Sequence, residues 1–194
     1  MLRYASKKLT NQLLINNAID PSLAEVYQYG FELTLSTLFT STAILLIACF
    51  MDSILFSLLY FSISIPLRMT AGGYHAPTYF RCFLLSIGTY FAVSLLAKCS
   101  APLMLPYPLW LALLLGSTYY ILANCPVRNP HHPVSASVLK KNRRIAVLFS
   151  CTLCGLTALL YIILRQSDIL NFIVLTVSSV SVLILPAKRK ERNE

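Results

Sequence analysis

Between residues 33 and 51 the chain reads LTLSTLFTSTAILLIACFM, nineteen residues without one charged side chain. At 1.5 Å of rise per residue, an α-helix of this length spans about 28 Å. The hydrocarbon core of a bilayer is about 30 Å thick, so the stretch predicts a helix that crosses a membrane. Three further runs of this kind follow it along the chain, at residues 109–125, 145–164 and 169–187.

Two other apolar runs are shorter. Residues 53–67 and 83–97 form runs of 15 residues each, and helices of that length would rise only about 22 Å. These runs flank the segment 68–82, which we therefore expect at the level of the lipid headgroups or slightly below it. Together the runs predict an all-α, polytopic membrane protein with about six spans, two of them short, in a single membrane domain over residues 1–194.

Composition points to the same class. Hydrophobic residues make up 57% of the 194 residues and charged residues only 12%, whereas a soluble domain carries about 25% charged residues. A small domain has too much surface to hide so apolar a chain, which excludes soluble, disordered and collagen-like classes. The formal net charge is +9. Because the cations punctuate apolar runs instead of forming a stripe, we expect no nucleic-acid partner.

The positions of those cations predict the topology. Cytoplasmic loops of membrane proteins carry an excess of Lys and Arg. If six spans leave both termini on the cytoplasmic side, fourteen of the 16 cations fall on that side and only Lys98 and Arg165 on the other. We therefore expect a multi-pass protein of the cell membrane, with both termini, the segment 68–82 and the basic loop 126–144 facing the cytoplasm.

The two ends of the chain are expected to stay outside the hydrocarbon. In residues 1–30, apolar positions recur at helical spacing among Lys, Asn and Gln, which is typical of amphipathic helices at a membrane surface. Pro21, directly after Asp20, suits the first turn of a second helix that leads through Glu32. After the last span, residues 188–194 form a basic tail.

The segment 68–82 is the one stretch that hydropathy does not explain. Residues 68–86 read RMTAGGYHAPTYFRCFLLS. Gly72 and Gly73 permit a tight turn, and we expect the next helix to start at the proline of position 77, because the residue before a proline avoids the helical region. Cys82 then lies in the second turn of that helix, with its side chain leaning back toward His75.

Such an arrangement suits a cysteine nucleophile. A neighbouring imidazole and a helix N-terminus both favour the reactive thiolate of Cys82. Arg68 and Arg81 add positive potential, and the backbone N–H groups after the paired glycines could receive a developing oxyanion. From spacing alone a structural alternative stays open, in which His75 hydrogen-bonds a carbonyl, the cysteine packs as a small residue and the glycines only make a turn.

The remaining cysteines and histidines give weaker signals. Cys151 and Cys154 have CxxC spacing but lie in the middle of a span, without a redox-type setting. His131 and His132, near Cys125, lack the four-ligand spacing of a structural zinc site. We expect no metal and no cofactor.

The string at residues 68–86 closely resembles the signature of the AgrB family, the accessory gene regulator B proteins, which are membrane peptidases that process quorum-sensing pro-peptides in Gram-positive bacteria. The likeness covers the arginine, the Gly-Gly-x-His core, the spacing from histidine to cysteine and the serine after it. Residues 29–32, Tyr-Gly-Phe-Glu, resemble an element that precedes the family's first span, and residues 124–129, Asn-Cys-Pro-Val-Arg-Asn, resemble its inner loop.

The resemblance implies that Cys82 is the nucleophile and His75 the general base and then the general acid. It implies attack on a peptide bond near the C-terminal end of a short pro-peptide with an amphipathic leader and an acidic tail. A side chain of the peptide would then attack the resulting thioester and close a thiolactone or lactone. A homodimer in the lipid bilayer is implied as well. Candidates for oxyanion stabilisation, positioning or substrate binding are Arg68, Gly72, Gly73, Glu32, Arg81 and Ser86.

Two other functional classes are the alternatives. One is a small transporter or channel with a re-entrant Gly-Gly-x-His loop, and the other is a scaffold that only exports or presents the peptide without cutting it. Transporters usually carry ionisable groups in mid-span or paired broken helices. In this chain the ionisable residues lie almost entirely at the predicted ends of spans, which favours the peptidase.

Overall fold

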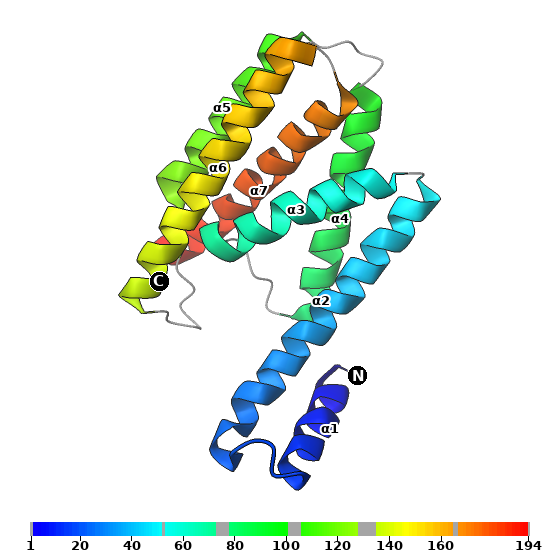
Figure 1. Cartoon of the computed structure of the whole chain (residues 1–194), viewed down its shortest axis with the longest axis vertical. Coiled ribbons are helices and arrows are strands. Elements are labelled where there is room, and N and C mark those ends of the chain that lie inside the picture. The colour runs from blue at the N-terminus through cyan, green and yellow to red at the C-terminus, as the bar shows by residue number, and fades with distance from the viewer. Residues whose placement is uncertain are drawn as a thin grey trace.

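The computed structural model describes residues 2–51, 53–72, 78–100, 106–127, 135–164 and 167–193, with backbone alone for residues 190–193. Over these ranges the chain is almost wholly helical and contains no strand (Figure 1). The prediction of an all-α, polytopic class is confirmed. The helices are α1 (Leu2–Ile15), the 3-10 turn η1 (Pro21–Leu23), α2 (Ala24–Phe50), α3 (Ile54–Ala71), α4 (Tyr79–Ser100), α5 (Tyr107–Asn124), α6 (Ala136–Leu164) and α7 (Asp168–Asn193).

Five helical segments are long and apolar enough to cross a membrane. They contain five of the six apolar runs expected as spans. The sixth run, 109–125, coincides with α5, which has 18 residues but is not among these five segments. A membrane crossing by α5 therefore stays a prediction. The five segments are Pro21–Phe50, Ile54–Ala71, Tyr79–Ser100, Ala136–Leu164 and Asp168–Arg189.

The two helices expected to be short are not. α3 has 18 residues and α4 has 22, so they rise about 27 and 33 Å. The length expectation is wrong because an apolar run ends at its first charged residue, whereas the helix continues. α3 runs on through Pro66 and Arg68, with the Thr70 hydroxyl donating to the carbonyl of Pro66 at 2.7 Å. Helix length therefore gives no reason to place the segment 68–82 below the headgroups.

The N-terminal region contains two helices. α1 is a separate helix that lies against the first half of α2 (Figure 1). Between them the Asp20 carboxylate accepts bonds from the hydroxyl and the backbone N–H of Ser22, at 2.6 and 2.8 Å, and these bonds lower the pKa of Asp20. α2 runs unbroken past Glu32 to Phe50. At the other end of the chain, α7 continues into the basic tail.

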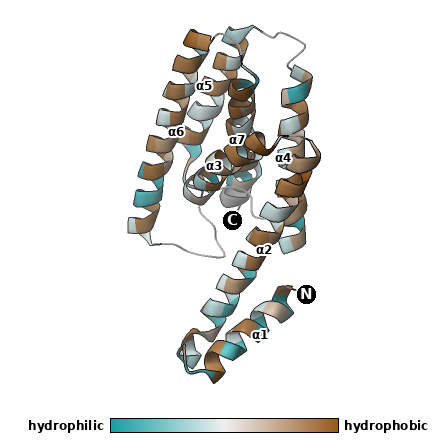
Figure 2. Cartoon of the chain, turned by 45° about the vertical axis from the view of Figure 1, so that its right-hand side comes forward, coloured by the Kyte–Doolittle hydropathy of each residue, from teal (hydrophilic) through white to brown (hydrophobic). Residues whose placement is uncertain are grey.

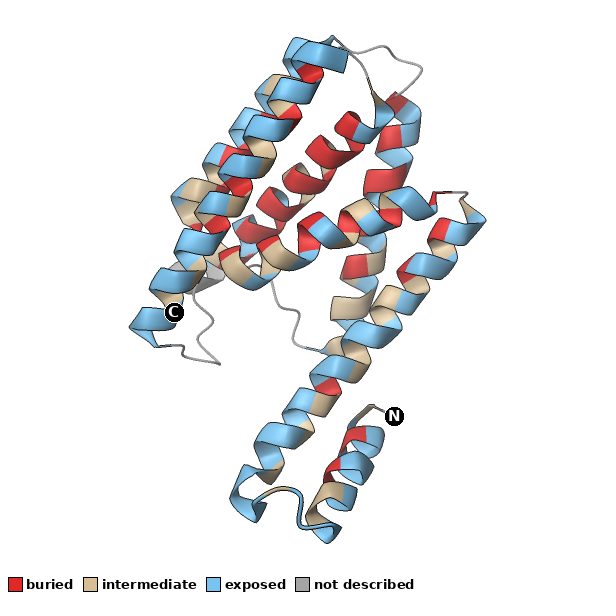
Figure 3. Ribbon diagram, viewed as in Figure 1, coloured by how far each residue is buried: buried red, intermediate tan, exposed pale blue. Residues whose placement is uncertain are grey.

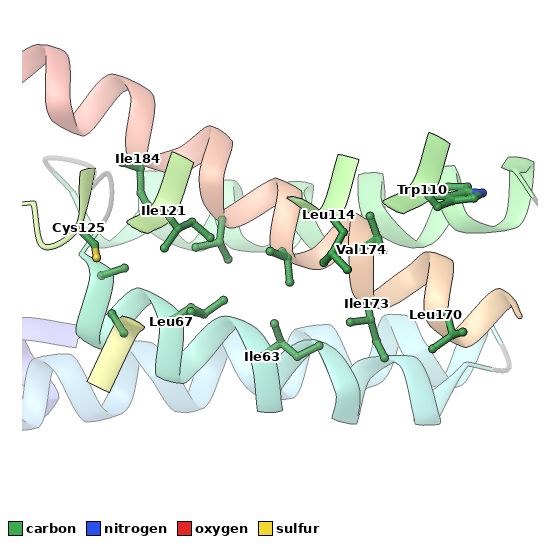
Figure 4. Close-up of a cluster of buried hydrophobic side chains, with 14 of the residues drawn as sticks. Ile63, Leu67, Trp110, Leu114, Ile121, Cys125, Leu170, Ile173, Val174 and Ile184 are labelled. Carbon is green, nitrogen blue, oxygen red and sulfur yellow. The ribbon is translucent and has the colours of Figure 1, made fainter. Parts of the chain in front are cut away.

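The core lies around α7. Most of its apolar segment is buried, whereas that of α2 is largely exposed, and Figure 3 shows buried residues following α7 through the bundle. One cluster joins α3, α5, α6 and α7 and includes Leu67, Leu114 and Val174 (Figure 4). A second cluster joins α2, α3, α4 and α7 around Tyr90 and Phe172. α3 and α7 contribute to both clusters, so they hold the two parts of the bundle together.

Many large apolar side chains are exposed on the helices, and Figure 2 shows hydrophobic residues along the helices of the bundle. An exposed apolar patch of more than a few hundred Å² is typical of an interface or a membrane-facing surface. Lipid chains are the environment in which so many apolar side chains can be exposed, and this identifies a membrane protein. Examples are Leu38, Phe39, Leu46, Phe50, Leu148, Ile162, Ile163 and Val182.

Five helix ends come together at one end of the bundle, where α3, α5 and α7 finish and α4 and α6 begin (Figure 1). We call this the basic end. At the opposite end, Lys98 Nζ donates to the carbonyl of Met51 at 2.9 Å and ties α4 to the end of α2. Which side of the membrane the basic end faces stays a prediction. The described cations of the basic end are Arg68, Arg81, Lys140, Lys141, Arg143, Arg144, Lys188 and Arg189.

Candidate functional site

Cys82 lies at the basic end, in the first turns of α4. The helix begins at Tyr79, two residues later than expected, so Cys82 is its fourth residue. The backbone N–H of Cys82 donates to the carbonyl of Thr78 at 3.0 Å, and its thiol is partly exposed. The unpaired N–H groups of a helix N-terminus carry partial positive charge. Cys82 therefore lies near this partial positive charge.

The other cysteines have different surroundings. Cys49 and Cys99 lie near the opposite end of the bundle, and Cys151 and Cys154 lie within α6. A second cysteine at the basic end follows α5 directly, but it is buried. Among the described residues, Cys82 is therefore the cysteine that combines the basic end, a helix N-terminus and access from outside.

Arg68 and Ser86 meet across α3 and α4. Nη1 of Arg68 donates to the hydroxyl of Ser86 at 3.3 Å, and Ser86 is buried. Ser86 lies one turn after Cys82 on the same face of α4, because residues four apart in a helix are neighbours. Two of the residues singled out from the sequence are thus brought together beside the thiol.

Glu32 is a buried carboxylate in the first third of α2. It is only 6% exposed. Its Oε1 accepts bonds from the Ser6 hydroxyl of α1 and from Nε2 of Gln28, both at 3.3 Å. Buried carboxylates need such partners, since an unpaired charge away from water is costly. The same carboxylate interacts with the hydroxyl of Tyr79, the first residue of α4.

Tyr79 is the residue that sequence reasoning missed. It lies three residues before Cys82, which places the two side chains on one face of α4. Through Glu32 it connects the start of α4 to α2, and Ser6 extends the connection to α1. The available signal was a tyrosine, with an apolar ring and a polar tip, directly after the expected turn. Nothing local indicates that its partner lies in α2, 47 positions earlier.

Gly72 ends α3 in a conformation that favours glycine. Its φ is +76°, and a Cβ added there would come within 2.9 Å of the Val127 carbonyl oxygen. The backbone N–H of Val127 donates to the carbonyl of Ala71 at 3.0 Å. The end of α3 is thus held against the segment that follows α5. The glycine that the sequence suggested for a turn is required by both the backbone angle and the space.

Two predicted site residues, Gly73 and His75, lie outside the described residues, as do His131 and His132. The expected approach of His75 to Cys82 therefore stays a prediction. Arg81, next to Cys82, is exposed. Within the described ranges there is no group of three or more His, Cys, Asp and Glu side chains that would hold a metal ion.

A cationic pocket of about 440 Å³ opens at the basic end between α5, α6 and α7. Lys140 and Arg143 come from the second and third turns of α6, and Lys188 comes from α7. None of the lining residues that the structure describes is acidic. They are Ala123, Asn124, Cys125, Pro126, Leu139, Lys140, Arg143 and Lys188.

Comparison with known families gives one match over nearly the whole chain. The model of the family described as Accessory gene regulator B matches residues 6–184. The chain belongs to the AgrB family. A comparison with curated proteins and another with solved structures gave no match.

Membership makes this AgrB protein a quorum-sensing accessory gene regulator protein of the membrane. In it, the described site residues bring α2, α3 and α4 together around one face of α4. Tyr79 and Ser86 lie on either side of Cys82 along that face. Tyr79 interacts with Glu32, and Ser86 accepts a hydrogen bond from Arg68.

Proposed function

We propose that this AgrB protein is a membrane cysteine endopeptidase. It would cut a short pro-peptide near its C-terminal end and let the rest cyclise to a thiolactone or lactone. The observation that carries the proposal is the face of α4 on which Cys82 lies between two anchored residues, Tyr79 and Ser86. Nucleophilic catalysis depends on a closely positioned attacking atom, and contacts from α2 and α3 supply that positioning.

In the first step the Cys82 sulfur bonds to the carbonyl carbon of the scissile peptide, and the carbon–nitrogen bond breaks. The thiol proton passes to His75 and from there to the departing amine, so the C-terminal fragment leaves with a free amino terminus. The remaining peptide stays bound to Cys82 as a thioester. An imidazole of ordinary pKa, about 6.5, is mostly neutral at pH 7 and can accept that proton.

In the second step a thiol or hydroxyl within the bound peptide attacks the thioester carbonyl. Its proton moves through His75 to the Cys82 sulfur, which leaves as a thiol, and the ring closes. The thioester keeps much of the acyl-transfer potential of the cleaved bond, so the cyclisation needs no ATP and no cofactor. Water must be excluded until the ring has closed.

The other site residues take supporting roles in this scheme. Backbone N–H groups after Gly72 and Gly73 would receive the negative oxygen of the tetrahedral intermediate. Arg68 and Glu32 would act as positioning residues through Ser86 and Tyr79. Exposed Arg81 would attract the acidic part of the peptide.

The proposed location and orientation rest on the excess of Lys and Arg at the basic end. The protein would be a multi-pass component of the cell membrane, with both termini and the basic end toward the cytoplasm, where a newly made peptide arrives. The amphipathic leader of such a peptide would lie on the bilayer surface. A homodimer completes the proposal.

The test uses the full chain in lipid nanodiscs with the synthetic pro-peptide. Mass spectrometry should detect release of a C-terminal fragment and, at short times, an acyl adduct on Cys82. Cys82→Ala should abolish both. His75→Ala should lower the rate by at least about a hundredfold, since general acid–base catalysis contributes about 10²–10⁴-fold. Cys99→Ala, at the opposite end, is the matched control and should cleave normally.

Continued cleavage by Cys82→Ala would exclude this cysteine as the nucleophile. Movement of intact peptide across the membrane, with no fragment and no adduct, would support a transporter or an export scaffold instead.

A further inference from the structure

We propose that the outward face of α6, at the start of the helix, binds the headgroup of an anionic phospholipid. The charges of this face are Lys141 and Arg144, with Lys140 beside them. The ligand is a component of the bilayer and not a substrate, so the inference goes beyond the proposed function and does not depend on it.

The helical period directs Lys141 and Arg144 away from the bundle. α6 packs against its neighbours through one face, whose buried residues are Ala146, Ser150, Thr157 and Tyr161. Successive residues of an α-helix lie about 100° apart around the axis. Lys141 and Arg144 are therefore on the opposite side of the helix, and both are exposed. Arg143 falls on the inner side, where it lines the pocket between α5, α6 and α7.

The same outward face continues as apolar surface along the rest of α6. Leu148 is 68% exposed and Ile162 is 69% exposed, and both follow the cations at helical spacing. Residues 145–164 contain no charge and rise about 30 Å, the thickness of the hydrocarbon core. Arg144 therefore lies at the edge of the lipid-facing segment, and Lys141 lies about one turn further out. A phospholipid has the same order, with charge at one end and acyl chains below it.

An open space of about 450 Å³ lies beside these cations. Its lining residues all belong to α6 and are Ser137, Lys140, Lys141, Arg144 and Ile145. A phosphate group in this space can accept charge-assisted hydrogen bonds from the ammonium and guanidinium groups, while Ile145 begins the apolar surface for the acyl chains. Because the space lies against the outer side of one helix, a lipid can reach it directly from the bilayer.

The sequence places few carboxylates where they could neutralise these cations. Residues 53–167 contain no Asp or Glu, so α3, α4, α5 and α6 have none. Of the described acids, three belong to the N-terminal region, and Asp168 begins α7 at the opposite end of the bundle. Glu191 and Glu194 belong to the basic tail, and the test below therefore includes their replacement.

A soluble phosphate shares the chemistry of the headgroup, and the depth of the site favours the lipid. The bilayer holds the phosphate of a lipid at the level where the apolar run of α6 begins. The lipid phosphate therefore meets Arg144 at a high effective concentration, whereas a soluble ion has to be drawn from water. The exposed apolar side chains below the cations add contacts that only a lipid can make.

The test uses native mass spectrometry of the full chain released from detergent micelles, with phosphatidylglycerol added in steps and phosphatidylcholine as the neutral reference. Arg144→Gln should raise the Kd for phosphatidylglycerol about fivefold, because a cation near the bilayer surface contributes about that factor to the attraction of anionic lipid. Lys141→Gln with Arg144→Gln should raise it about twentyfold. The matched control is Arg143→Gln, the same substitution one position earlier on the inner side, which should change the Kd less than about twofold.

Three outcomes would overturn the inference. Equal losses in Arg143→Gln and Arg144→Gln would mean that net charge attracts the lipid without a site. Displacement of bound phosphatidylglycerol by glycerol 3-phosphate would identify a site for soluble phosphate instead. Binding that becomes tighter by more than about threefold after Glu191→Gln with Glu194→Gln would show that the tail already supplies the anion. We expect no displacement by glycerol 3-phosphate and an unchanged Kd in the tail variant.

Discussion

The charged residues on the two sides of the basic end differ in burial and in hydrogen bonding. On the α4 side, Glu32 is buried among Ser6, Gln28 and Tyr79, and Arg68 is bonded to Ser86. On the α6 side, Lys141 and Arg144 stand exposed on the outward face of the helix. One side fixes its polar groups to each other, whereas the other presents them outward.

The difference separates two tasks. A nucleophile needs neighbours that hold still, because misplacement by about 1 Å can cost a hundredfold in rate. A binding surface for a lipid headgroup needs charge and access, and tolerates mobile side chains. Substitutions on the α4 side should therefore lower kcat, and substitutions on the α6 side should weaken the binding of anionic phospholipid.

The largest effect is expected at Gly72, where the two sides are joined. Gly72→Ala places a Cβ against the Val127 carbonyl and forces a side chain onto a φ of +76°. We expect about 2 kcal/mol of lost stability from the strained backbone and at least about a hundredfold lower cleavage. Thermal unfolding in detergent and fragment release measure the two.

Gly155→Ala is the control for that change. Gly155 lies within α6 with nothing within 4 Å of an added Cβ, and alanine is the better helix former. Stability should stay equal or rise slightly. A Gly72→Ala protein as stable and as active as Gly155→Ala would mean that the two sides are not coupled through this contact.

The next effect is expected at Glu32. Glu32→Gln removes the charge that Ser6, Gln28 and Tyr79 share, and bonds to charged groups are worth about 1.5–3 kcal/mol. We expect kcat to fall about tenfold with KM nearly unchanged. Glu25→Gln, an exposed acid in the first turn of the same helix, should have no effect.

Tyr79→Phe should lower kcat by a smaller factor, about threefold, because it removes one of the three partners. Combined with Glu32→Gln, it should add little beyond Glu32→Gln alone, since both act through one contact. Full additivity of the two losses in kcat would show that Tyr79 does not act through the carboxylate.

Ionic strength should affect the two sides differently. Raising ionic strength from 0.1 to 1 M shortens the screening length from about 10 to 3 Å. Exposed charges of the α6 side should lose attraction, and the Kd for phosphatidylglycerol should rise about fivefold. The buried contacts of the α4 side should keep kcat within about twofold. A fall in kcat with a constant Kd for the lipid would reverse the assignment of tasks.

An effect as small as that of Tyr79→Phe is expected at Ser86. Ser86→Ala removes the acceptor of Arg68 at a cost of about 1 kcal/mol, and kcat should fall about threefold. Ser62→Ala serves as the control, because the Ser62 hydroxyl bonds only the Leu58 carbonyl of its own helix. Identical kinetics for the two variants would remove Arg68 from the positioning residues.

Sequence reasoning predicted the class and the apolar segments because these depend on local pattern, whereas the catalytic role of Cys82 stays a prediction. It underestimated α3 and α4, since hydropathy ends at Arg68 on one side and begins only after Cys82 on the other, while the backbone remains helical. The contacts of Tyr79 with Glu32 and of Gly72 with Val127 could not be predicted. Each joins residues dozens of positions apart, and no periodicity encodes such pairs.

The unbroken course of α2 has a consequence for depth in the bilayer. Its 27 residues extend about 40 Å, roughly 10 Å more than the hydrocarbon core. Glu32 is the ninth residue of this rigid rod, about 12 Å from its start. The fit of the apolar part of the rod to the lipid therefore sets how far from the hydrocarbon the carboxylate lies. We therefore expect the thickness of the membrane to affect the position of Glu32, and with it the candidate active site.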